Sequence, residues 1–331
     1  MRQAILEGKR KFVVRDVPQP VLDEDEVLIK VQYCGICGSD LITFIEGVPA
    51  RYGHEYAGDI VEVGKDVKNF EIGDRVTAES ISSCGECHWC RRGQINLCDN
   101  FDMLWTQSAC GFATYTKAKY HQLHKLPPEL RYEEAALTEP TAVALHSVML
   151  SGLSIGNVVA VLGLGPIGQL VARLVKLAGA RAVYATEASK SRIELARDAV
   201  DEVIDINVSE PVNRILELTG GNGADLVFES AGAVSATQQA MTLVRKGGSI
   251  VIVGVCIHPV DILAGSIPLR ELTIKGSMVF SSGEYATALN LIADKKIDVA
   301  PLITSVMPLD DITEAFEKAV GGEGGKILIK P

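Results

Sequence analysis

Several common features are missing from this sequence of 331 residues, and each absence excludes a class of protein. No apolar run reaches the roughly 18 to 20 residues that span a bilayer, and the first residues show no secretory leader. Internal repeats and low-complexity tracts are also absent, which argues against a solenoid or a disordered interaction tail. We therefore expect a soluble, cytoplasmic protein with no membrane partner.

Basic charge is in short supply as well. The chain carries 32 Lys and Arg against 42 Asp and Glu, a formal net charge of −10, and the basic residues are scattered. No surface suited to nucleic-acid phosphates is expected, so a small-molecule partner is favoured. A chain of this length exceeds the usual size of a single core, which predicts two domains.

Cysteine is sparse, but four of the 8 cysteines lie in one short run: Cys84, Cys87, Cys90 and Cys98. Gaps of two, two and seven residues allow four thiolates to surround one tetrahedral metal ion. The overall density is too low for a disulfide-stapled secreted domain. We predict a structural zinc in a lobe at about 80–100, where polar residues and glycine leave too little apolar surface to fold without metal.

The pattern of strands and helices changes along the chain. Short β-segments separated by Gly, Pro and Asp fill residues 2–111 and predict a barrel-like β domain. After about His146, apolar strands alternate with helical periodicity, which predicts a doubly wound parallel sheet. The expected strands are 158–162, 182–186, 202–206, 225–229 and 249–254, and the expected helices are 166–178, 190–199, 212–219 and 235–244.

The alternation stops near Ser282, and a helix followed by a final strand returns the chain to a mixed α+β character. We infer that this last segment packs back on the first domain. The predicted domains are therefore a discontinuous one, residues 1–146 and 284–331, and a dinucleotide-binding one, residues 147–283.

A glycine pattern, Gly163-Leu-Gly165-Pro-Ile-Gly168, lies between the first of these strands and its helix. In this context Gly163 permits a tight turn, Gly165 lets backbone approach a pyrophosphate, and Gly168 allows close packing of helix on strand. Pro166 and Ile167 begin the helix, whose free amides face the phosphates. The alternative is a glycine turn that only packs a strand on a helix.

The choice of dinucleotide depends on Glu187, which ends the next strand. A carboxylate there accepts hydrogen bonds from ribose hydroxyls and repels a 2′-phosphate, so NAD(H) is favoured over NADP(H). Arg192 and Lys190 lie nearby and could meet a phosphate if Glu187 turned away, which keeps NADP(H) open. Gly254 and Val255 follow a later strand, at the edge where such sheets bind ligands.

A second metal site is suggested by Cys37, His54, Glu55 and Glu139. A thiolate, an imidazole and a carboxylate can hold zinc with one position open for chemistry. Each residue also has an ordinary explanation: a small core thiol, a buried hydrogen-bonding ring, or a charge at a helix start. Spacing alone leaves both interpretations open.

Together these motifs resemble the zinc-containing medium-chain dehydrogenases, over nearly the entire chain. Within that superfamily they are most similar to the polyol branch, which comprises sorbitol, 2,3-butanediol and threonine dehydrogenases. Glu139-Pro140 stands where ethanol-type alcohol dehydrogenases carry a cysteine ligand. The matching motifs, in family order, are Gly35–Asp40, Gly53–Glu55, Cys84–Cys98, Glu139-Pro140 and Gly163–Gly168.

The resemblance implies a GroES-like β-barrel catalytic domain, completed by the C-terminal segment, and a Rossmann domain. It also implies that Cys37 and His54 ligate a catalytic zinc, while Glu55 and Glu139 share the carboxylate role. Relatives differ in which of the two glutamates touches the metal. Ser39 is then placed to hydrogen-bond the substrate alkoxide. Val143 is placed behind the nicotinamide, with ordinary core packing as its alternative role.

Two departures from the family pattern stand out. Ile42 replaces the histidine that passes a proton to solvent in most relatives, so Thr43, the cofactor ribose or water must take over. The loop that ends at Gly53 is shorter than usual, which lowers one wall of the substrate cleft. Three apolar residues could line that cleft, although an apolar contact surface is the favoured role: Met103, Leu104 and Trp105.

We predict a zinc-dependent oxidoreductase that transfers a hydride from a polyol or secondary alcohol to NAD, with one catalytic and one structural zinc per chain. The alternative within the branch is an L-threonine 3-dehydrogenase-like enzyme, for which no unambiguous amino-acid anchor is visible. Two other classes compete: a non-catalytic NAD-sensing protein, opposed by the complete second metal set, and a zinc-ribbon nucleic-acid module, opposed by net acidity. The resemblance further implies a homo-oligomer, a tetramer or a dimer.

Overall fold

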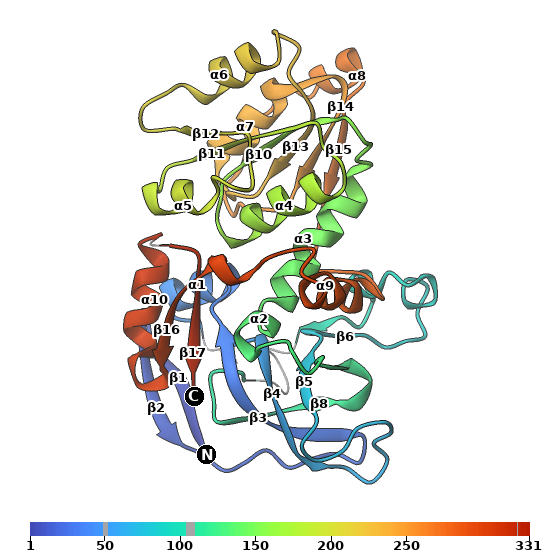
Figure 1. Ribbon diagram of the computed structural model, residues 1–331, viewed down its shortest axis with the longest axis vertical. Helices are drawn as coiled ribbons and strands as arrows, with labels where there is room; N and C mark the ends of the chain where they lie inside the picture. The colour runs from blue at the N-terminus through green and yellow to red at the C-terminus, as the bar shows by residue number, and fades with distance from the viewer. Residues whose placement is uncertain (49–51, 104–109, 323) are drawn as a thin grey trace. The chain divides into compact units, whose positions relative to one another are not determined.

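The computed structural model describes residues 1–331 except 49–51, 104–109 and 323. The chain forms two compact units (Figure 1). One unit comprises Met1–Pro140 together with Ser281–Pro331, and the other comprises Thr141–Phe280. Among the described residues, no helix is both long and apolar enough to cross a membrane.

The first unit is built on a seven-stranded sheet in the order β16-β17-β3-β4-β5-β9, with β8 pairing with β3. Neighbouring strands are antiparallel, except that β16 and β17 run parallel. The strands are β3 Glu26–Gly35, β4 Glu55–Val63, β5 Arg75–Ala78, β8 Tyr115–Lys119, β9 Leu123–Lys125, β16 Ile303–Pro308 and β17 Lys326–Lys330.

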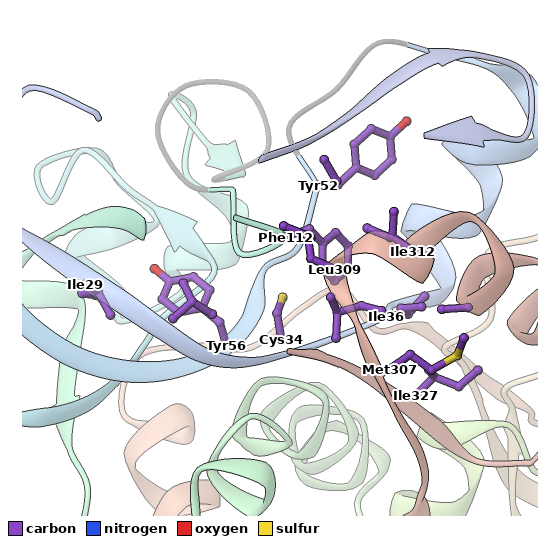
Figure 2. Packing of buried hydrophobic residues seen from close by; sticks show 14 of the residues in the cluster. Ile29, Cys34, Ile36, Tyr52, Tyr56, Phe112, Met307, Leu309, Ile312 and Ile327 are labelled. Atoms are coloured by element: carbon purple, nitrogen blue, oxygen red, sulfur yellow. The ribbon is translucent and has the colours of Figure 1, made fainter. Parts of the chain in front are cut away.

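The C-terminal segment supplies part of this sheet and part of its core. Strand β17 pairs with the end of β3, where Leu328 faces Gly35 and Ile329 faces Cys34. Figure 2 shows Met307 and Ile327 in the same apolar cluster as residues from the first third of the chain. Burial of these side chains therefore joins the two ends of the sequence.

Short helices and two small sheets complete the first unit. Helix α1 begins after Cys37, whose backbone N–H donates to the Asp40 side chain at 3.1 Å, and it ends at Gly47, which has a left-handed φ of 71°. Besides short 3-10 turns, the other helices and strands described in this unit are β1 Arg2–Gly8, β2 Lys11–Asp16, α1 Gly38–Glu46, β6 Ile81–Ser82, β7 Asp102–Met103, α2 Tyr132–Ala135, α9 Glu284–Ala293 and α10 Ile312–Val320. Helix α3, Thr138–Ser151, begins in this unit and continues in the second.

The second unit is a six-stranded parallel sheet in the order β12-β11-β10-β13-β14-β15. Central strand β10 is buried along its whole length, as its unbroken apolar sequence requires. The strands are β10 Val158–Leu162, β11 Ala182–Glu187, β12 Glu202–Asp205, β13 Ala224–Glu229, β14 Val244–Ile252 and β15 Thr273–Gly276. The predicted doubly wound parallel sheet is confirmed.

Helices cover both sides of this sheet, with α4 on one side and α7 on the other (Figure 1). Several predicted boundaries differ from the structure by one or two residues, and two differ by more. The helix that begins at Lys190 ends at Leu195, because the next residues form tighter i to i+3 hydrogen bonds, and β14 follows α7 directly at Val244. The helices are α4 Pro166–Leu177, α5 Lys190–Leu195, α6 Pro211–Leu218, α7 Val234–Leu243 and α8 Ser266–Arg270.

Candidate active site

Antiparallel pairing of β3 and β4 brings the mixed set of metal-ligand candidates together. Gly35 and Glu55 face each other across the two strands, so Cys37, just beyond β3, lies close to His54, just before β4. One ligand atom from each of Cys37, His54 and Glu55 lies within 4.8 Å of the others. This set provides sulfur, nitrogen and oxygen, a combination that fits zinc.

The surroundings of this set are buried and strongly charged. His54 is buried, and its Nδ1 atom lies 3.8 Å from Oδ1 of the buried Asp40. Burial lowers the pKa of His54, but the Cys37 thiolate and the Asp40 carboxylate outweigh it and place that pKa well above its ordinary value. A zinc ion would displace this proton, because a metal-ligating histidine is neutral.

Glu139 occupies a neighbouring but separate position. It lies in the first turn of α3, and its Oε1 atom accepts a 2.8 Å hydrogen bond from the hydroxyl of buried Ser80. Burial raises the pKa of Glu139, against the lowering effect of His54. Among the described residues, Glu139 is outside the set whose ligand atoms all lie within 4.8 Å, whereas Glu55 is inside it.

A buried cation neutralises Glu55. The Nζ atom of Lys326 lies 2.7 Å from both carboxylate oxygens of Glu55 and donates a 3.0 Å hydrogen bond to the carbonyl of Ile36. Both charged side chains are almost fully buried. Burial lowers the pKa of Lys326, but Glu55 and Cys37 outweigh it and raise the pKa above its ordinary value.

Ser39 and Thr43 differ in how their hydroxyls are used. The Ser39 hydroxyl oxygen is inaccessible to solvent and has no hydrogen-bond partner in the described part of the chain. The Thr43 hydroxyl instead donates a 2.9 Å hydrogen bond to the carbonyl of Asp40. A buried, unpaired hydroxyl is costly, so Ser39 fits a site where a ligand completes its hydrogen bonding.

Sequence reasoning missed three residues of this site: Asp40, Ser80 and Lys326. Asp40 lies inside a recognised motif, so its position was a usable signal. Ser80 and Lys326 gave no local signal, because their contacts with Glu139 and Glu55 span 59 and 271 residues.

The four-cysteine run folds into one compact cluster. The sulfur atoms of Cys84, Cys87, Cys90 and Cys98 lie within 4.8 Å of one another, and none of the eight cysteines, all of them among the described residues, forms a disulfide. Backbone N–H groups donate to three of these sulfurs at 3.3 to 3.5 Å. Hydrogen bonds from the N–H groups of Cys90 and Asp99 lower the pKa of Cys87 to about 6, whereas burial raises the pKa of Cys98 to about 11.

The glycine turn lies between β10 and α4, as its spacing predicts. Gly163 has a φ of 91°, which glycine adopts readily, and Pro166 and Ile167 form the start of α4. Around Gly165 the turn is open: of the residues that the structure describes, a Cβ atom there would meet only the Arg192 guanidinium, at 3.9 Å. This opening leaves room for a phosphate group to approach the backbone.

Glu187 ends β11 beside this turn, and its carboxylate already accepts backbone hydrogen bonds. Oε2 accepts from the N–H of Leu164 at 2.8 Å, and Oε1 accepts from Ala188 at 2.8 Å and Ser189 at 2.9 Å. A carboxylate has about four acceptor positions, so capacity for a ribose hydroxyl remains.

The other predicted cofactor contacts lie in the second unit. Gly254 donates to the carbonyl of Glu229 at 2.9 Å beyond β14, and Val255 beside it is exposed. Val143 is half-buried in α3. Of the residues proposed for the substrate cleft, Met103 ends β7, while Leu104 and Trp105 lie outside the described residues.

Comparisons with known proteins agree with this geometry. Residues 23–128 match the alcohol dehydrogenase GroES-like domain, and residues 166–294 match the zinc-binding dehydrogenase family. Sorbitol dehydrogenase from Halalkalibacterium halodurans is 35% identical, with 98% of this chain and 97% of the relative aligned.

Two solved structures match 100% of this chain and 99% of their own, each at 32% identity. One is a zinc-binding dehydrogenase from Sinorhizobium meliloti bound to NADP, with a TM-score of 0.93. The other is 2R,3R-butanediol dehydrogenase from Bacillus subtilis, with a TM-score of 0.90. The expected GroES-like and Rossmann architecture is thereby confirmed. The chain belongs to the polyol branch of the zinc-containing medium-chain dehydrogenases, enzymes that use zinc and a nicotinamide cofactor.

Proposed function

We propose that this enzyme oxidises a polyol or another secondary alcohol at a zinc ion held by Cys37, His54 and Glu55. The observation that carries the proposal is the convergence of these three ligand atoms within 4.8 Å. Ser39 follows Cys37 by two residues, and its buried hydroxyl has no hydrogen-bond partner among the described residues. Three protein ligands leave the fourth position of a tetrahedral zinc for substrate. The relatives named for sorbitol and butanediol support the choice of a polyol.

Bound zinc lowers the pKa of an alcohol hydroxyl, and bound nicotinamide accepts the hydride. The protein's own task is to hold and move the proton. Ser39 hydrogen-bonds the substrate oxygen and receives its proton, since its hydroxyl is not committed to another described residue. The Thr43 hydroxyl already donates to the carbonyl of Asp40, and the side chain of Ile42 has no group that could accept and release a proton. In this proposal the proton therefore leaves Ser39 through the cofactor ribose or water.

The two glutamates have different tasks in this proposal. Glu55 is the direct ligand, while Glu139, held by Ser80, is the second carboxylate beside the metal site. Glu55→Gln should therefore lose bound metal as well as turnover, whereas Glu139→Gln should lose turnover and keep its metal. Metal analysis of both variants separates the two tasks, and the reverse pattern would reassign the ligand to Glu139.

We assign a second, structural zinc to Cys84, Cys87, Cys90 and Cys98, giving two zinc ions per chain. Elemental analysis of the purified protein should find two equivalents. Cys37→Ala should retain one and lose activity, while Cys256→Ala, outside both clusters, should retain two and remain active. Undiminished activity of Cys37→Ala would contradict the catalytic assignment.

NAD is the favoured cofactor because Glu187 places a negative charge at the end of β11, where ribose hydroxyls bind. NADP is the second candidate, supported by the Arg192 guanidinium near Gly165 and by the NADP-bound relative. Dissociation constants for NADH and NADPH, measured by fluorescence titration, decide between them. Tighter binding of NADPH would reverse the preference.

Substrate choice is tested by following reduced nicotinamide absorbance with diols, sugar alcohols and L-threonine. We expect turnover of a polyol or vicinal diol, because the site offers no unambiguous anchor for an amino acid's charged groups. Activity on L-threonine alone would favour the threonine dehydrogenase alternative. Absence of turnover with every alcohol, together with cofactor binding, would favour a non-catalytic sensor.

The enzyme is further proposed to be a cytoplasmic homo-oligomer, a dimer or a tetramer. Strand β15 supports self-association, because it ends the six-stranded sheet and all four of its residues are exposed. Leu263 and Leu269 in the preceding segment are also largely exposed. An open strand edge beside exposed apolar side chains is typical of a surface that another chain covers.

A further inference from the structure

The glycine turn between β10 and α4 is fastened to the neighbouring strand β13 by one side chain. The hydroxyl of Ser230, directly after β13, lies 2.8 Å from the carbonyl oxygen of Gly163 and 3.1 Å from that of Leu162. The backbone N–H of Ser230 also donates to the Leu162 carbonyl, at 2.9 Å. Ser230 therefore fixes two successive carbonyl groups at the entrance to the turn.

The opposite side of the same peptide group is fixed by Glu187. The peptide bond between Gly163 and Leu164 directs its carbonyl to Ser230 and its N–H to Oε2 of Glu187, at 2.8 Å. Because the peptide group is planar, these two contacts hold its orientation from both sides. The turn is thus clamped between β13 and β11, the strands on either side of β10.

Close packing shows that the fit at Ser230 is specific. A Cβ atom on Gly168 would lie 2.8 Å from the Ser230 hydroxyl and 2.0 Å from the Gly163 carbonyl oxygen. A Cβ atom on Gly163 would lie 2.8 Å from the Cβ of Ala231. At both outer glycines of the motif, the residues that follow β13 therefore leave no room for a side chain.

The end of β13 is itself a firm anchor. Glu229 is fully buried, and its Oε1 atom accepts the N–H groups of Ala231 at 2.9 Å and Gly232 at 2.8 Å. Its backbone carbonyl accepts the N–H groups of Val253 and Gly254 beyond β14. Movement of Ser230 is restrained by these bonds, so its hydroxyl can hold the turn in place.

We infer that Ser230 is a positioning residue for the cofactor: its hydroxyl holds the Gly163 peptide in the orientation that the dinucleotide needs. The inference rests on the proposed function, which places the diphosphate at this turn. Ser230 need not touch the cofactor itself. Loss of the hydroxyl would let the peptide rotate, and the cofactor would then have to restore its orientation on binding.

The test compares Ser230→Ala with the natural enzyme in its zinc-loaded form. Fluorescence titrations with NADH and NADPH identify the cofactor that the natural enzyme binds more tightly. For that cofactor, the variant should have about a tenfold larger dissociation constant, the size expected for one hydrogen bond of about 1.4 kcal/mol. The Michaelis constant for the alcohol at saturating cofactor, and kcat, should stay within about twofold. A role in stability alone would not weaken cofactor binding while leaving kcat and the Michaelis constant for the alcohol unchanged.

Thr219→Val is the matched control. It removes another hydroxyl of the second unit, one that donates to the carbonyl of Ile215 at 2.8 Å. Thr219 precedes β13, whereas Ser230 follows it, so the two residues lie at opposite ends of that strand. This variant should bind cofactor normally even if it melts at a lower temperature. Normal cofactor binding by Ser230→Ala, or equally weakened binding by Thr219→Val, would overturn the inference. Failure of the natural protein to bind either cofactor would instead overturn the proposed function on which the inference rests.

Discussion

The charge of single residues determines how the candidate metal site is held together. Lys326 is the buried cation that meets Glu55, and Cys37, Asp40 and Glu139 add further acidic groups nearby. A buried carboxylate deprived of its counter-ion is strongly destabilising, because neither water nor another charge compensates it. The contact between the last strand and β4 is therefore a condition for the site to exist.

We expect Lys326→Met to destabilise the protein by about 3–5 kcal/mol, the typical cost of leaving one partner of a buried ion pair alone. Urea unfolding followed by circular dichroism measures this loss. Added zinc should reduce the difference, since a metal bound to Glu55 supplies positive charge. Lys330→Met, an exposed lysine of the same strand, is the control and should change stability little. A loss below about 1 kcal/mol for Lys326→Met would contradict the role given to the pair.

Residues of the site differed in how far sequence could reveal them. Cys37, His54 and Glu55 belong to short motifs at the ends of β3 and β4, and the pairing of these two strands of the predicted β domain brings them together. The long-range contacts of Ser80 and Lys326 could not be read from local pattern, because an apolar strand such as Lys326–Lys330 gives no sign that its first residue is buried. Tertiary packing, not local preference, decides such positions.

At the scale of elements, the parallel sheet was predictable because each buried strand is an unbroken apolar run bounded by glycine or a charged residue. The first and last residues of its strands and helices were less predictable. Strand β14 begins at Val244, but its pairing with β13 shifts register there: Val244 faces Ala224, Ser249 faces Leu226, and Gly247 between them has a left-handed φ of 67°. The early start of β14 thus rests on the pair at Val244, a register irregularity that the expected strand at 249–254 does not reveal.

Asp225, near the start of β13, makes hydrogen bonds to β10 and to Arg245 of β14 whose strength depends on pH. Asp225 accepts the N–H of Val158 at 2.6 Å and the Nε–H of Arg245 at 2.5 Å. Partial burial raises the pKa of Asp225, but these two hydrogen bonds outweigh it and bring the pKa below its ordinary value. A lowered folded-state pKa stabilises the fold above the unfolded-state value, about 3.9, and that contribution is lost as pH falls through the folded-state value.

We therefore expect Asp225→Asn to lower the free energy of unfolding by about 1–2 kcal/mol at pH 7, the range of a charge-assisted hydrogen bond in a partly exposed site. The difference from the natural protein should shrink as pH falls below about 4. Urea titrations at pH 7 and at pH 3.5 measure both values. Asp198→Asn, an exposed partner of Arg173, serves as the control and should change little at either pH. A difference that is the same at both pH values would exclude the charge of Asp225 as its cause.

At the scale of the whole molecule, the proposed self-association can be tested at β15, the edge strand of the six-stranded sheet. Strand β15 ends this sheet in the described part of the chain, its four residues are exposed, and Leu263 and Leu269 lie exposed in the segment before it. A stable interface buries roughly 1,200 Å² or more in total, and apolar anchors near its centre carry much of the affinity.

We therefore expect the double variant Leu263→Glu and Leu269→Glu to have a smaller particle mass than the natural enzyme in light scattering. Val208→Glu adds a charge at an equally exposed apolar residue after β12, the opposite edge of the sheet, and should leave the mass unchanged. A monomeric natural enzyme, or a double variant of unchanged mass, would show that β15 and its leucines do not form the contact.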